Sequence, residues 1–198
     1  MNRKTLTSTA RALSLFLLVA ATCAFAQERK PIHFTGLIND YSPATVKMGP
    51  WEMHGQWSLD LHAELGTADF YADMTMSDYG TSGVFDATQA GQNAHTHHIR
   101  LTGIRVTWNI LGCPQYSPNP TVIGFQLTGP VSLVTGNGSN APFETTPPSS
   151  TLQVCLTGGN EVQRSNISLV FAGPATTHFG SQAIHGVVHK ETADSPGN

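Results

Sequence analysis

The densest group of side chains capable of chemistry is the segment His95-Thr96-His97-His98. His95 and His97 are two residues apart, so on a β-strand their side chains point the same way, with Cα atoms about 6.6 Å apart. This spacing lets two imidazoles bind one metal ion. Both histidines share their parity with apolar Ile99, so we expect them to face the interior of the fold near its mouth.

A third ligand would have to come from another part of the chain. His54 and His178 are the candidates, because a simple antiparallel strand order brings both to the same end as His95. His54 falls on the polar face of its strand, so His178 is the better candidate. His95, His97 and His178 with one open position would match a zinc or copper site, either binding or catalytic. In the alternative interpretation, His95 and His97 are polar residues at a strand start that hydrogen-bond to loop backbone.

Motifs for other kinds of catalysis are missing. The sequence contains neither a GxSxG nor an SxxK motif, which are typical of serine nucleophiles. Asp69 and Asp73 share one strand face, but a solvated surface explains them better than the paired carboxylates of a glycosidase. The sequence therefore leaves open whether the protein is an enzyme.

The clearest element pattern is a hairpin. Residues 51–63 alternate between apolar and polar side chains, which predicts a long strand with one buried and one wet face. After a turn at 64–67, residues 68–76 alternate again. The two segments therefore predict a pair of antiparallel strands.

The turn also predicts the register of this hairpin. With a turn at 64–67, Leu61 would lie opposite Phe70 on the inner face. On the outer face, His62 would lie opposite Asp69. These pairs are the unit by which neighbouring strands stabilise each other.

Shorter apolar patterns complete an all-β domain. We expect six more strands, at residues 32–37, 95–110, 123–133, 152–156, 167–171 and 178–189. The strand at 95–110 changes phase at Gly103, which predicts a β-bulge. No segment has a convincing helical pattern. The fold class is therefore all-β, a single antiparallel domain of about eight strands, either an up-and-down barrel or a two-sheet sandwich.

Two cysteines, Cys113 and Cys155, lie in this domain. In simple meander order both fall at the end of the tight turn 64–67, where they can meet. In an exported chain they predict one disulfide. The closed loop of about 42 residues would contribute on the order of 4 kcal/mol.

Residues 1–26 are typical of a secretory signal peptide. A basic start precedes the short apolar run 12–21, and Ala24-Phe25-Ala26 forms a small-x-small cleavage site. We therefore expect a periplasmic or secreted protein.

Cleavage would leave the all-β domain at 27–190 and a flexible polar tail at 191–198. An alternative makes Cys23 a lipid-modified N-terminal residue, although the residues before it fit a lipobox poorly.

The charge balance limits the partners of the protein. The whole chain has a net charge of −3, from 10 basic and 13 acidic residues. The predicted signal peptide contains three of the basic residues, so the mature chain has a net charge of about −6. This argues against nucleic acid or an anionic membrane as a partner. After residue 26, no segment approaches the run of roughly 18 apolar residues that a membrane-spanning helix needs. The sequence does not indicate an oligomeric state.

Three functions fit these observations. The interpretation favoured by a small margin is a binding module for a small apolar or amphipathic molecule, lined near its mouth by Trp51, Met53 and Trp57. The alternative is the histidine-ligated zinc or copper site. A second alternative is a structural envelope or secreted protein without a site. Because an exported β-scaffold hosts all three equally well, the fold alone does not separate them.

Overall fold

The computed structural model describes residues 30–46, 49–78, 94–114, 122–136, 147–159 and 166–192. The predicted signal peptide and Cys23 lie outside these residues. So do the last six residues of the predicted C-terminal tail, 193–198. All strands belong to the unit Pro31–Asn198.

The described residues form nine strands and one short helical segment. The strands are β1 (Ile32–Tyr41), β2 (Trp51–His62), β3 (Thr67–Asp78), β4 (His95–Thr107), β5 (Val122–Pro130), β6 (Ser132–Gly136), β7 (Thr151–Gly159), β8 (Asn166–Ala172) and β9 (Ile184–Thr192). The helical segment joins η1 (Gly173–Ala175) to α2 (Thr176–Phe179). The last strand ends two residues beyond the predicted domain boundary at 190.

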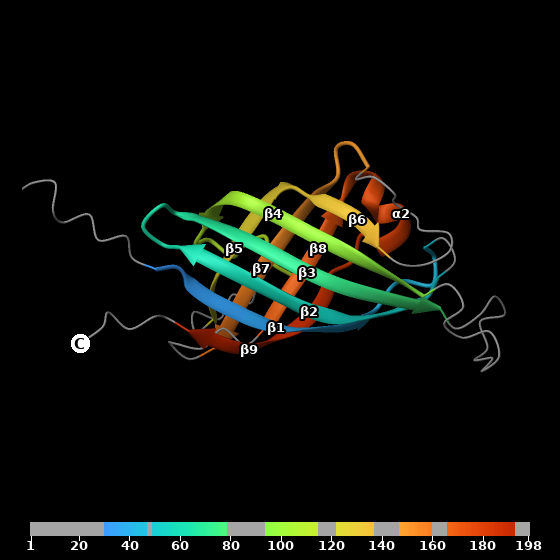
Figure 1. Cartoon of the computed structure of the whole chain (residues 1–198), viewed down its shortest axis with the longest axis horizontal. Helices are drawn as coiled ribbons and strands as arrows, with labels where there is room; N and C mark the ends of the chain where they lie inside the picture. Colours follow the sequence, from blue (N-terminus) through green and yellow to red (C-terminus); the bar gives the residue numbers. More distant parts are fainter. Residues whose placement is uncertain are drawn as a thin grey trace, which may run out of the picture. The chain divides into compact units, whose positions relative to one another are not determined.

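Eight of the strands close into an antiparallel barrel in the order β1-β2-β3-β4-β5-β7-β8-β9, and β9 pairs with β1 (Figure 1). The extra strand β6 follows β5 after a single residue, Val131, and pairs with the first half of β4. The predicted all-β antiparallel domain is therefore confirmed. The architecture is a barrel rather than a sandwich. Because β3 pairs with β4 and β9 pairs with β1, the eight-stranded sheet has no open edge.

The connections differ between the two ends of the barrel. Strands β1, β3, β6 and β8 all end at one end, which we call the long-loop end, and the tight β2–β3 turn lies at the other. Figure 1 shows α2 at the same end as the tips of β3 and β6. This is the arrangement that a simple meander predicts.

The interior of the barrel is packed with side chains. Phe34 on β1 and Phe125 on β5 come from opposite walls, and their ring centroids are 5.8 Å apart. Both rings are completely buried. In an eight-stranded barrel, the interior is just wide enough for side chains to fill. These two rings show that at this level the interior is a packed core.

The β2–β3 hairpin is confirmed, but the predicted register was wrong. Phe70 lies opposite Leu59 rather than Leu61. The turn closes one residue earlier on each strand, because Leu65 donates its backbone N–H to the His62 carbonyl at 3.0 Å. Gly66 then returns the chain with a φ of 64°, a left-handed conformation that favours glycine.

The two-position shift keeps every side chain on its predicted face, because the side-chain period of a strand is two. His62 lies opposite Thr67 rather than Asp69. Its Nε2 still reaches the Asp69 carboxylate diagonally, at 3.2 Å. The predicted contact between His62 and Asp69 is thus present with a different backbone pairing.

The predicted bulge in β4 is confirmed. Gly103 has a φ of 64°, and the β3–β4 register shifts between Ala68 and Phe70. Asp69 holds the bulge by accepting the backbone N–H of Gly103 at 2.6 Å. The bulge moves the inward positions of β4 from the parity of Leu101 to that of Val106.

The expected strand at 178–189 begins only at Ile184, and the expectation of no helix was wrong. Residues before it form η1 and α2, and His178 lies on α2. Pro174 occupies the first turn and Gly180 follows the last helical residue with a φ of 82°. Proline near the start and glycine past the end are the usual signals of a helix.

None of the helical segments in the described residues has the length and apolar character of a membrane-spanning helix.

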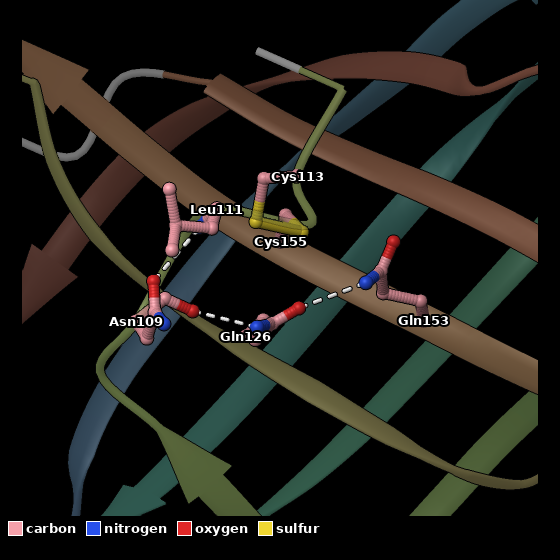
Figure 2. The surroundings of a disulfide bond; sticks show 6 residues. All are labelled: Asn109, Leu111, Cys113, Gln126, Gln153 and Cys155. Atoms are coloured by element: carbon pink, nitrogen blue, oxygen red, sulfur yellow. Dashed lines mark hydrogen bonds between the residues drawn. A yellow bond between two sulfur atoms is a disulfide. The ribbon is translucent and has the colours of Figure 1, made fainter. Parts of the chain in front are cut away.

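The predicted disulfide between Cys113 and Cys155 is confirmed, with Cα atoms 5.9 Å apart. It ties the segment after β4 to β7, and the two sulfurs pack with Ile110 in a small cluster separate from the main core. Figure 2 shows the polar contacts beside the bridge. Gln126 donates to the Asn109 carbonyl at 2.6 Å and accepts from the Gln153 amide at 2.8 Å.

Candidate metal centre

Strand β4 places two histidines inside the barrel. His95 and His97 alternate with the less buried Thr96 and His98, and they share the inward face with Ile99. They are 4% and 0% exposed, respectively. The inward orientation that the alternation predicts is therefore observed.

The η1–α2 segment brings the third histidine to the same point. Gly173 starts the segment with a φ of 74°, and an added Cβ there would lie 2.5 Å from the Ser149 carbonyl oxygen. Phe179 anchors the segment by stacking on Phe171 of β8, with ring centroids 4.2 Å apart. His178 precedes this anchor and is 6% exposed. The short helix thus turns His178 into the long-loop end of the barrel.

The three imidazoles converge through their Nε2 atoms. The Nε2 of His178 lies 3.0 Å from that of His95 and 3.1 Å from that of His97. One ligand nitrogen from each of the three residues lies within 4.8 Å of the other two. Around a tetrahedral ion with bonds of 2.0–2.1 Å, such nitrogens are about 3.3 Å apart. The group is close enough to hold one metal ion. Around such an ion, the two contacts to His178 would lengthen by a few tenths of an ångström, and the widest separation, 4.8 Å, would shorten by about 1.5 Å.

Burial keeps two of these histidines neutral. Desolvation lowers the pKa of His97 from 6.5 to about 2, helped by the neighbouring His178 and His95. Desolvation also lowers the pKa of His178 to about 3, helped by His95. Each shift disfavours the charged form, as expected for a buried base beside other bases. Neutral imidazoles are the form that binds metals.

Aromatic rings form the wall of this histidine cluster. Trp51 lies edge-on to His95 at a centroid distance of 5.1 Å and tilted to His178 at 5.4 Å. Phe179 contacts His97 at 4.8 Å. The start of β2 holds Trp51 in place, because its backbone N–H donates to the Ser42 hydroxyl at 2.8 Å. The cluster therefore lies in an apolar, enclosed surrounding.

The residues expected to line a small-molecule site are all buried. Trp51 borders the histidine cluster, and Met53 and Trp57 follow it along the inward face of β2. The indole Nε1 of Trp57 has no hydrogen-bond partner among the described residues. A ligand-lining role for these three residues stays a prediction.

The other described histidines lie outside the cluster. His54, the weaker candidate for a third ligand, is exposed on β2. His98 points outward, and its Nδ1 lies 2.6 Å from the Asp73 carboxylate. His185 lies 2.9 Å from Asp40 in the same manner. The preference for His178 as the third member therefore agrees with the observed geometry.

Sequence reasoning missed two features of the site. It assigned His178 to a strand, although the proline and glycine around residues 173–180 could have indicated the helix. It also did not connect Met74 and Met76 with the histidines. Their alternation with polar residues predicts that both face inward, but only the β3–β4 register shows which histidine each one faces.

No protein-family model, curated protein or solved structure matches this chain.

Proposed function

We propose that this protein binds one zinc or copper ion through His95, His97 and His178. The observation that carries the proposal is the convergence of three buried Nε2 atoms. Three histidines leave one coordination position for another ligand. At exposures of 4%, 0% and 6%, the cluster is better suited to retaining an ion than to exchanging a substrate, so we propose binding in preference to catalysis.

Metal analysis of the purified protein tests this proposal. The oxidised protein should contain, or take up on reconstitution, one zinc or copper ion per chain. The variant His95→Ala/His97→Ala should lose it. The matched control is His98→Ala, which removes the neighbouring outward-facing imidazole and should leave the stoichiometry unchanged. Absence of metal from the unaltered protein after reconstitution with either ion would contradict the proposal.

Export to an oxidising compartment is the second part of the proposal. The signal-like residues 1–26 support it, and so does the Cys113–Cys155 disulfide, since such bonds persist in secreted and periplasmic proteins. Mass spectrometry of the protein from a bacterial periplasmic fraction should give a chain that starts at Gln27. A lipid-modified chain that starts at Cys23 would support the alternative, and an uncleaved chain in the cytoplasm would refute export.

Small-molecule binding is the second candidate function. The specific observation that favours it is that the indole Nε1 of Trp57 has no hydrogen-bond partner in the part of the chain that the structure describes, on a residue that is 3% exposed. A buried donor without a partner costs about 1–3 kcal/mol, and a bound acceptor group would remove this cost. Native mass spectrometry should then detect a co-purified molecule that is lost in Trp57→Phe. A bare protein mass after gentle purification would count against this candidate.

A further inference from the structure

Two buried methionines lie directly opposite the two inward-facing histidines of β4. In the β3–β4 register, Met76 pairs with His95 and Met74 pairs with His97. All four side chains are on the inward face, and both methionines are completely buried. The Cβ atoms of such cross-strand pairs are about 4.5–5.5 Å apart. A methionine side chain is long and flexible enough to bring its sulfur into the space between paired residues.

The donor groups of the site are imidazoles, and the residues that face two of them across the strands carry thioethers. The converging group found among the described His, Cys, Asp and Glu side chains contains histidines only. The carboxylates that contact histidines elsewhere, such as Asp73 beside His98, lie on the outer surface. Imidazole suits both zinc and copper, whereas thioether sulfur selects Cu(I). A methionine sulfur that joined the three imidazoles as a ligand would therefore favour copper over zinc.

Burial favours the ion of lower charge. Among the described residues, the rings of the cluster contact the aromatic side chains of Trp51 and Phe179. The cost of moving an ion out of water into such a medium rises with the square of its charge, so a monovalent ion pays about a quarter of the cost of a divalent one. Both the ligand type and the surroundings thus point to the same oxidation state.

We propose that the metal is Cu(I), bound by His95, His97 and His178 with the thioether of Met74 or Met76 as an additional ligand. This inference rests on the metal site of the proposed function and specifies its ion. It assigns Met74 and Met76 a role beyond filling the core.

Anaerobic competition titrations of the mature full-length protein test the inference. One series uses Cu(I) with a chromophoric Cu(I) chelator, and the other uses Zn(II) with a zinc chelator. In Met74→Leu/Met76→Leu, the Cu(I) affinity should fall by about tenfold or more, the scale on which outer ligands tune metal sites. The zinc affinity should change by less than about threefold, a small free-energy difference. X-ray absorption of the Cu(I) form should show a copper–sulfur distance that the variant lacks.

Leu59→Met is the matched control, the same exchange in the opposite direction. Leu59 is equally buried and faces inward on β2, but it lies opposite Phe70 rather than opposite a histidine or a proposed methionine ligand. Leucine and methionine have similar volumes, an exchange that core positions tolerate well. The two single variants provide the same comparison if the double variant does not fold. The control should retain the Cu(I) affinity of the unaltered protein.

The outcomes separate this inference from the proposed function. Histidine-dependent binding of Cu(I) that the leucine substitutions do not weaken would overturn the copper–thioether inference and leave the metal site intact. Binding of zinc without any binding of Cu(I) would do the same. An equal loss of zinc and Cu(I) affinity in the double variant would also overturn it, because a purely structural role predicts that result. Absence of all metal binding would refute the proposed function itself.

Discussion

At the scale of single residues, the main property of the histidine cluster is that its imidazole side chains are buried. His97 is completely buried, and His178 is nearly so. The pKa of each is lowered first by burial and then by neighbouring histidines. The folded protein therefore presents neutral imidazoles to a metal, and it resists the protons that would compete for the same nitrogen atoms.

The stability of the metal-free protein should depend on these two residues below pH 6.5. Above this pH both histidines are neutral in the folded and unfolded states, so neither makes the free energy of unfolding depend on pH. Below it, both histidines become protonated in the unfolded chain. In the folded state they stay neutral until the pH falls to about 3 for His178 and about 2 for His97. The free energy of unfolding should thus fall with falling pH, by about 2 kcal/mol per group at pH 5.

Urea unfolding of the metal-free protein at pH 7.5 and pH 5 measures this loss. His97→Leu should remove the contribution of His97 and make the pH dependence shallower. His98→Ala, which changes an outward-facing residue, should not reproduce this effect. Identical pH dependence in the unaltered protein and in His97→Leu would contradict the prediction, because it would mean that His97 binds protons equally in the folded and unfolded states.

At the scale of elements, the site depends on how one short helical segment leaves β8. Strand β4 needs only alternation to point His95 and His97 inward. His178 needs a sharp change of direction at Gly173, where the backbone is left-handed and the Ser149 carbonyl lies close. The stacked pair Phe171 and Phe179 then fixes the segment against the barrel.

Gly173→Ala should disturb this turn. Alanine at a φ of 74° is strained, and its Cβ would approach the Ser149 carbonyl oxygen to 2.5 Å. We expect a loss of about 1–3 kcal/mol in the free energy of unfolding and weaker metal binding, because His178 is displaced. Denaturant unfolding and metal titration measure the two effects.

The matched control for this variant is Gly112→Ala. An added Cβ at Gly112 meets nothing closer than 3.4 Å, so we expect a change of less than about 0.5 kcal/mol. Unchanged metal affinity in a folded Gly173→Ala protein would indicate that the turn does not position His178.

At the scale of the whole molecule, barrel closure and the disulfide act at different places. The barrel closes through the β3–β4 and β9–β1 pairs. The disulfide instead ties the segment after β4 to the outer side of β7, in a cluster separate from the main core. The bridge and the histidine cluster therefore lie at opposite ends of β4.

Cys113→Ser/Cys155→Ser should lower stability without removing the metal site. The bridge closes a loop with a sequence separation of 42 residues, which is worth about 4 kcal/mol in the chain-entropy model. The denaturant midpoint should fall accordingly, while the metal stoichiometry of the folded variant stays at that of the unaltered protein. A folded variant with normal stability but no metal would show that the bridge positions the histidines instead.

The sequence alone determined the features that depend on local periodicity. Alternation predicted the hairpin, the bulge at Gly103 and the inward direction of His95 and His97, because a side-chain period of two assigns each residue to a face without any knowledge of the partner strand. Two cysteines at one end of a meander were enough to predict the disulfide. These predictions needed neither the exact register nor the closure of the sheet.

Only the tertiary structure decided how those faces meet. A register shift of two residues leaves every face unchanged, so the pattern could not show that Met76 lies opposite His95. The placement of His178 required the turn at Gly173 and the packing of Phe179 on Phe171, contacts between parts of the chain that local patterns do not connect. Barrel rather than sandwich was likewise decided by long-range pairing, since the same alternating strands bury one face equally well in either architecture.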